Sequence, residues 1–232
     1  MTQTESCLDE AGTAFATNST ADNIPWRSID TMPSSLQSHA ASKRAVLKTS
    51  LSTSKTVLLL VDCINPMQFD GADDLAETAL EVASATAVLK RHLSSKGVRS
   101  IYVNDNFGHW HSDFDGLTRH CRKLGGVSAK LVRTLLPGPA DLRVLKPRHS
   151  GFHGTPLDLL LTQLDARQLI LAGFAADLCV QFTAMDAFVR GYKLWIPQDC
   201  VAAESPQRKQ AALEWMALAL KARTSASMRR SR

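Results

Sequence analysis

The sequence predicts an α/β protein in which a parallel sheet is covered by helices on both faces. The first observation is TVLLLV at 56–61, an uninterrupted apolar run of the kind that forms a strand buried on both faces. The second is that such runs alternate with longer segments of helical spacing as far as residue 222. Alternation of this kind produces right-handed βαβ units, and therefore a parallel sheet.

Five strands and four helices are expected after residue 55. The strands are predicted at 56–61, 98–103, 142–145, 168–173 and 192–197, and the helices at 75–97, 156–166, 178–191 and 205–222. Gly97 and Gly191 are suited to end helices, while Pro156 and Pro206 are suited to begin them. Chemistry in such sheets gathers at the carboxyl ends of the strands. Polar residues directly after strands are therefore the candidates for function.

Composition and charge set the domain organisation. The 232 residues are 44% hydrophobic and 21% charged, which is enough for one sizeable core. Residues 1–50 are rich in Ser, Thr and Ala and are expected to form a flexible or loosely docked extension to a domain at 51–222. The net charge of +5 arises in the last twelve residues, so 223–232 is interpreted as a basic disordered tail. A solvated tail is favoured over a nucleic-acid arm, and no nucleic-acid partner is expected.

Membrane insertion and secretion are also not expected. No window approaches the ~18 uninterrupted apolar residues of a membrane helix, and the acidic start MTQTESCLDE lacks the apolar core of a secretory signal. The five cysteines are scattered, without a C-x-x-C pair, which argues against a disulfide framework and a zinc site. A reducing, cytoplasmic compartment is the natural interpretation.

Three chemically useful side chains follow three different strands. Asp62 follows the first, Lys146 the third, and Cys179 the fourth, at the predicted start of a helix. Each also has an ordinary interpretation: a turn cap, a solvated lysine and a small buried hydrophobe. Free N–H groups and the helix dipole at a helix start would lower the pKa of a thiol, so Cys179 is expected to be a thiolate nucleophile.

A polar cluster follows the second strand. It comprises Asn104, Asp105, Asn106, His109 and His111. A metal site is one interpretation, because His and Asp are suitable ligands, but nothing in the spacing makes them converge. A pocket wall or lid is favoured. The residues expected to line the substrate pocket are Asn104, Asn106, Phe107, Trp110 and Phe152.

Three motifs resemble the isochorismatase-like cysteine hydrolase superfamily, which includes nicotinamidases and N-carbamoylsarcosine amidases. LLLVDCINPMQF is similar to its first-strand motif, and LKPRHSGFHGTPLDLLL to its lysine motif, K-x-R-x-S-A-F. LAGFAADLCVQFTAMDAFVRGYKLWIPQDCVAA resembles its most specific segment, G-x-x-x-D-x-C-V-x-x-T-A-x-D-A-x-x-R-G-Y. The resemblance covers about residues 55–220.

The resemblance implies a three-layer αβα sandwich on a mostly parallel six-stranded sheet. The sixth strand would be short, near residues 200–204 or after the last helix. It also implies that Asp62 is the general base, Lys146 the cationic partner and Cys179 the nucleophile. A cis peptide is implied between Phe174 and Ala175, and the N–H groups of Ala175 and Cys179 would form the oxyanion hole. No cofactor is implied, and homodimers or homotetramers are common among relatives.

The sequence departs from the family pattern at several positions. Phe107 stands where nicotinamidases carry the first histidine of their metal set, so no metal is expected. Cys179 argues against vinyl-ether hydrolysis, because true isochorismatases generally lack this cysteine. Ile64 replaces a frequent glutamine, and Gly151 replaces the alanine of the lysine motif. Both changes are expected to reshape the pocket.

Three hypotheses about function follow. The first is a cysteine hydrolase that cleaves a C–N bond of a small amide through a thioester on Cys179. The second is a non-catalytic protein that uses the same scaffold to hold a small ligand. The third is a thiol-sensing role for Cys179, which ranks last because no partner cysteine lies at short spacing.

Overall fold

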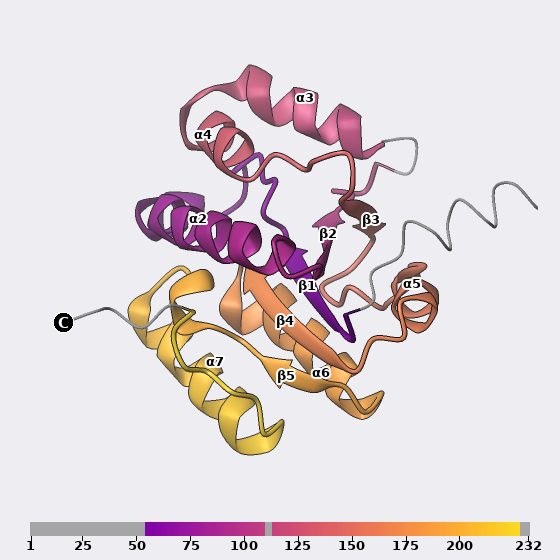
Figure 1. Ribbon diagram of the computed structural model, residues 1–232. Helices are drawn as coiled ribbons and strands as arrows, with labels where there is room; N and C mark the ends of the chain where they lie inside the picture. The colour runs from indigo at the N-terminus through magenta and orange to yellow at the C-terminus, as the bar shows by residue number, and fades with distance from the viewer. Residues whose placement is uncertain (1–53, 110–112, 228–232) are drawn as a thin grey trace, which may run out of the picture. The chain divides into compact units, whose positions relative to one another are not determined.

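The computed structural model describes residues 54–109 and 113–227, which contain a parallel sheet of five strands in the order β3-β2-β1-β4-β5 (Figure 1). The strands are β1 (Thr56–Val61), β2 (Arg99–Asp105), β3 (Leu142–Lys146), β4 (Gln168–Gly173) and β5 (Lys193–Trp195). Every neighbouring pair is parallel, which confirms the predicted sheet. The carboxyl ends of the strands therefore lie along one edge.

The expectation of a sixth strand is wrong for the described part of the chain. At the two places suggested for it, only isolated parallel bridges form, between Gly173 and Val201 and between Trp195 and Arg223. The first segment enters the short 3-10 helix Gln198–Cys200 just before its bridge, so it has no room to extend along β4.

Helices flank the sheet in two groups. They are α2 (Ala72–Ser94), α3 (Phe114–Leu124), α4 (Gly126–Thr134), α5 (Leu157–Gln163), α6 (Gln181–Val189) and α7 (Pro206–Ala219). The sequence did not predict α3 and α4. The signal for α3 was present, because Phe114, Leu117 and Cys121 are buried at helical spacing and the Asp113 side chain accepts from the Gly116 N–H as an N-cap.

Two hydrophobic cores lie on opposite faces of the sheet. Leu58 and Leu60 of β1 pack with residues of α2, α3 and α4, whereas Leu59 and Val61 pack with residues of α5, α6 and α7. Figure 1 shows the two helical groups on either side of the strands. This three-layer arrangement explains why β1 is apolar at every position, since successive side chains point to opposite, equally buried faces.

The folded body continues past residue 222. Arg223 donates its N–H to the Leu194 carbonyl and accepts from the Ile196 N–H, so residues 223–227 run beside β5. Ser227 bonds the Asp199 carboxylate through both its N–H and its hydroxyl. The predicted boundary at 222 is therefore too early, because residues 223–227 still pack along β5, the outermost strand of the sheet.

Residues 1–53 and 228–232, and with them most of the expected extension and tail, lie outside the described residues. No helix in the described ranges combines the length and apolarity needed to cross a membrane.

Candidate active site

The three side chains predicted from strand ends meet at the carboxyl edge of the sheet. Lys146 Nζ lies 2.9 Å from Asp62 Oδ2 and 3.4 Å from Cys179 Sγ. The lysine thus joins the carboxylate to the thiol. These residues are up to 117 positions apart in the chain, and the parallel order β3-β2-β1-β4 is what brings them together.

Asp62 is held in one orientation by its backbone and by its neighbours. It directly follows β1 with φ of 50°, a left-handed conformation that Asp tolerates better than most residues. Its N–H donates to the Val103 carbonyl at 2.9 Å, and its Oδ1 accepts from the Asp105 N–H at 2.7 Å. Both carboxylate oxygens therefore have partners before any substrate binds.

Lys146 is completely buried and faces two carboxylates. Its ammonium lies 3.4 Å from Asp105 Oδ2 as well as 2.9 Å from Asp62 Oδ2. Burial alone would lower the pKa of this lysine, but the nearby Asp62 carboxylate, together with Cys179 and Asp105, raises it above its ordinary value. Lys146 is therefore charged at neutral pH. Asp105 belongs to this cluster because its backbone pairs with Lys146 in the β2–β3 register.

Cys179 lies on a π-helical turn rather than on the first turn of an α-helix. The turn spans Ala176–Val180 and leads directly into α6. Within α6, the buried Thr183 hydroxyl donates to the Cys179 carbonyl at 2.6 Å and accepts from the Gly151 N–H at 2.9 Å. Thr183 thus ties the turn that holds the thiol to the loop that follows Lys146.

The expectation that Cys179 is a thiolate with a lowered pKa is wrong. Burial and the nearby Asp62 carboxylate raise the pKa of the Cys179 thiol to about 12, although the Lys146 ammonium acts in the opposite direction. Loss of solvent around the sulfur therefore outweighs the effect of the helix start. The protein at rest carries a neutral thiol beside an ammonium.

Among the four cysteines that the structure describes, Cys179 alone is partly exposed. Cys63, Cys121 and Cys200 are buried, and burial raises the pKa of each of their thiols. This agrees with the selection of Cys179 as the candidate nucleophile, because a reagent must reach the sulfur before it can react.

The segment before Cys179 contains a cis peptide bond between Phe174 and Ala175. Among the described residues, the Ala175 N–H has no acceptor, whereas the next N–H, of Ala176, donates to the Ala202 carbonyl at 2.7 Å. Within the described part of the chain, a backbone donor four positions before Cys179 is thus left available.

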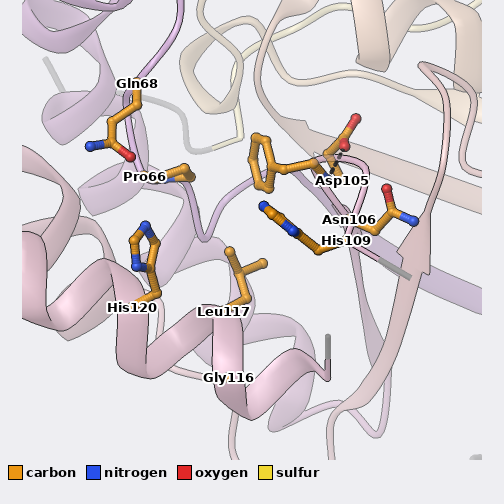
Figure 2. A pocket seen from close by; sticks show the side chains of 9 residues that line it. Pro66, Gln68, Asp105, Asn106, His109, Gly116, Leu117 and His120 are labelled. Carbon is orange, nitrogen blue, oxygen red and sulfur yellow. Dashed lines mark hydrogen bonds between the residues drawn. The ribbon is translucent and has the colours of Figure 1, made fainter. Parts of the chain in front are cut away.

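A pocket of about 330 Å³ adjoins the site through Asp105. It is lined by Pro66, Gln68, Asp105, Asn106, Phe107, His109, Gly116, Leu117 and His120. Figure 2 shows Leu117 of α3 beside His109, and His120 of the same helix on the side of Pro66 and Gln68, while Asp105 at the end of β2 and Asn106 after it lie across the pocket. Its walls therefore offer carboxylate, amide and imidazole groups around a partly apolar interior.

The residues predicted to line the substrate pocket lie in different surroundings, and their role stays a prediction. Asn106 and Phe107 line this pocket. Asn104 does not, because it is fully buried and donates to the Ile64 carbonyl at 2.6 Å. Phe152 does not either, because it packs in the core against Tyr192. Trp110 lies outside the described residues.

One further side chain touches the sulfur. His149 Nδ1 lies 3.6 Å from Cys179 Sγ, and the exposed imidazole packs at 5.5 Å between ring centroids against Phe182 of α6. No role for His149 was expected from the sequence. Its position three residues after Lys146 was the available signal, but only the folded loop turns it towards the thiol.

Within residues 54–109 and 113–227, no three His, Cys, Asp or Glu side chains are grouped so as to hold a metal ion. That no metal acts in this protein stays a prediction, since His111 of the polar cluster lies outside these ranges.

Comparison with known proteins places this arrangement in a family. The model of the isochorismatase domain matches residues 56–227. The chain belongs to the isochorismatase family. It is 36% identical over 166 residues to the uncharacterised isochorismatase family protein YaaI of Bacillus subtilis (strain 168), which covers 72% of this chain and 91% of the relative.

Solved structures show the same fold for this isochorismatase-family chain. The nicotinamidase of Staphylococcus aureus superposes with a TM-score of 0.58 at 24% identity, covering 75% of this chain and 98% of the other. The N-carbamoylsarcosine amidase of Thermoplasma acidophilum gives a TM-score of 0.56 at 24% identity, covering 75% and 97%. Identity at this level supports the shared α/β fold, and the family membership makes the protein a hydrolase.

Proposed function

We propose that this protein is a cysteine hydrolase that cleaves an amide-type C–N bond of a small molecule through a thioester on Cys179. The observation that carries the proposal is the position of Lys146 Nζ, 2.9 Å from Asp62 Oδ2 and 3.4 Å from Cys179 Sγ. A buried ammonium in contact with both groups stabilises negative charge on whichever of them is deprotonated. Transfer of a proton from thiol to carboxylate therefore does not leave an uncompensated charge.

In the first half of the reaction, Cys179 gives its proton to Asp62 as the sulfur attacks the carbonyl carbon. The raised thiol pKa means that this transfer accompanies attack and does not precede it. The N–H groups of Ala175 and Cys179 are the proposed donors to the oxyanion. As the tetrahedral intermediate collapses and the C–N bond breaks, the nitrogen takes a proton from an acid at the site and leaves as the free amine or ammonia, and a thioester remains.

In the second half, water adds to the thioester, its proton passes to the group that protonated the leaving nitrogen, and the C–S bond breaks. The departing sulfur takes back a proton from Asp62, which restores the resting thiol and carboxylate. Lys146 remains charged throughout, and its role is to hold Asp62 and the sulfur in contact.

The relatives indicate which substrates to test first. Structural neighbours bear the names nicotinamidase and N-carbamoylsarcosine amidase, which point to primary amides and N-carbamoyl amino acids. The amide and imidazole groups around the pocket can hydrogen-bond such compounds. We therefore propose a screen for ammonia release across small primary amides and N-carbamoyl acids, nicotinamide and N-carbamoylsarcosine included.

The Cys179→Ser and Cys179→Ala variants test the proposal. Loss of the nucleophile should reduce turnover by several orders of magnitude, far more than lost packing explains. Circular dichroism checks that each variant is folded, and Cys121→Ser is the matched control because its thiol is buried in the hydrophobic core that α2, α3 and α4 form on one face of the sheet. Full ammonia release by folded Cys179→Ser would refute the thioester mechanism.

A non-catalytic ligand-binding protein is the alternative, and the raised pKa of the Cys179 thiol is the observation that favours it. Such a protein would bind members of the same panel without releasing ammonia. Isothermal titration of the panel separates the two functions. Binding without turnover would establish the alternative, and turnover that depends on Cys179 would exclude it.

We also propose that the protein acts in the cytoplasm as a homodimer or homotetramer. The exposed apolar side chains Trp215 and Leu218 on α7 support self-association. Native mass spectrometry at micromolar concentration should give a multiple of 25.3 kDa. A monomeric mass would refute this part of the proposal.

A further inference from the structure

The sulfur of Cys179 contacts one buried side chain and one exposed side chain. Lys146 Nζ reaches it at 3.4 Å from the buried side, where the lysine has no exposed surface. His149 Nδ1 reaches it at 3.6 Å, and this imidazole is exposed. The imidazole of His149 therefore lies on the solvent side of the sulfur, opposite in exposure to Lys146.

Asp62 is poorly placed to act on that side. Its side chain is only 7% exposed, its Oδ2 is paired with Lys146 at 2.9 Å, and its Oδ1 accepts from the Asp105 N–H at 2.7 Å. It can take the proton of the adjacent thiol. A leaving nitrogen, however, departs towards solvent, where the exposed group in contact with the sulfur is an imidazole.

The charges around the thiol are compatible with a protonated imidazole. Lys146 faces two carboxylates, Asp62 and Asp105, so these three groups together leave one negative charge uncompensated. A protonated imidazole carries an N–H on each ring nitrogen, so His149 Nδ1 can donate a proton. The ring of Phe182, at 5.5 Å between centroids, supports the imidazole over the sulfur.

We infer that His149 is the general acid that protonates the leaving nitrogen when the C–N bond breaks. The inference rests on the proposed cysteine hydrolase function and adds a fourth catalytic residue to it. It divides the two proton transfers between two groups. Asp62 serves the thiol on the buried side, and His149 serves the substrate on the open side.

The protons balance over the cycle. The thiol proton of Cys179 passes to Asp62 as the S–C bond forms, and the proton on His149 Nδ1 passes to the nitrogen as the C–N bond breaks. Neutral His149 then accepts a proton from the water that attacks the thioester. Asp62 returns its proton to the sulfur as the C–S bond breaks, so both groups regain their starting states.

The test compares substrates that differ in their need for an acid. The amide is the panel compound with the fastest ammonia release, and the ester is 4-nitrophenyl acetate, whose nitrophenolate leaves without a proton. His149→Gln should lower kcat/KM for the amide about 100-fold or more, as expected for loss of a general acid. Acetylation of Cys179 by the ester, followed by mass spectrometry, should change by less than about threefold.

His153→Gln is the matched control, because His153 is an exposed imidazole in the same loop, whereas within the described residues the hydrogen-bonding partners of the sulfur are Lys146 and His149. It should leave both rates unchanged. His149→Asn provides a second variant if His149→Gln is misfolded by circular dichroism.

Two results would overturn the inference. An equal loss for amide and ester would mean that His149 acts on the sulfur or through packing, and no loss for either would return the leaving-group proton to Asp62. Failure of the underlying function is separately visible, since Cys179→Ser would then retain amide turnover.

Discussion

Asp62→Asn should uncouple the reactivity of the thiol from catalysis. The carboxylate is the second cause, after burial, of the raised Cys179 pKa, because a negative oxygen beside the sulfur opposes a second negative charge. Asparagine removes that charge while keeping nearly the same shape. The variant should therefore lose hydrolysis and yet alkylate faster at Cys179 than the wild-type protein.

The magnitude follows from the geometry. The Asp62 oxygen lies 2.9 Å and the sulfur 3.4 Å from the same Lys146 Nζ, so the two are no more than about 6 Å apart. At an effective dielectric constant of about 20, two charges at this distance interact by about 3 kcal/mol, which corresponds to about 2 pKa units. The thiol pKa of the variant should thus fall from about 12 to roughly 10.

The rate of alkylation rises by less than the amount of thiolate. At pH 8 the lower pKa gives about 100-fold more thiolate, but a less basic thiolate is a weaker nucleophile, with a Brønsted coefficient of about 0.4–0.5. The net expectation is alkylation by iodoacetamide about tenfold faster than in the wild-type protein. Amide hydrolysis should fall about 100-fold or more, because the thiol proton has lost its acceptor.

Mass spectrometry of the Cys179 peptide over time, between pH 7 and pH 10, measures the alkylation rate. Asp105→Asn is the matched control, since this carboxylate also contacts Lys146, at 3.4 Å, but is not among the causes of the thiol shift. Its alkylation rate should stay close to that of the wild-type protein. Alkylation of Asp62→Asn that is unchanged or slower would refute the electrostatic reasoning.

Substitutions at three positions test the packing around the site by chemical or thermal unfolding. Lys146→Met leaves two carboxylates without their cation and should cost about 3–5 kcal/mol in urea at pH 7. Because pairing raises the lysine pKa, this loss should persist up to about pH 10 and shrink above it, and a loss below about 1 kcal/mol would contradict the pairing. Gly173→Ala should cost more than about 4 kcal/mol, because φ is 120° and a Cβ would lie 1.9 Å from the Val61 carbonyl oxygen; a normal melting curve would contradict this. Thr183→Val should cost about 1–3 kcal/mol through the Gly151 N–H that it leaves unpaired, whereas Thr183→Ser should cost less, and equal losses would argue that the hydroxyl is unimportant.

The elements with a simple physical signature were predictable from the sequence. The predicted bounds of β1 and β4 are those of the structure, because a strand buried on both faces is apolar throughout, whatever packs on it. By contrast, α3 was missed because its apolar positions are few and separated by charged residues, so that only the spacing of Phe114, Leu117 and Cys121 marks it. The prediction of a sixth strand was wrong. It came from the family resemblance, and the sequence has no pattern that separates a short strand from the isolated bridges that form at the two suggested places.

The sequence by itself determined which residues end the central strands, and thereby that Asp62, Lys146 and Cys179 share one edge of the sheet. Alternating strands and helices allow only parallel pairing of one handedness, so the direction of each strand end follows from the pattern. Only the tertiary structure decided that Asp105 and His149 join them, and that the thiol pKa is raised instead of lowered. The reason is physical: burial and charges within a few ångströms set a pKa, and here they come from segments far apart in the chain.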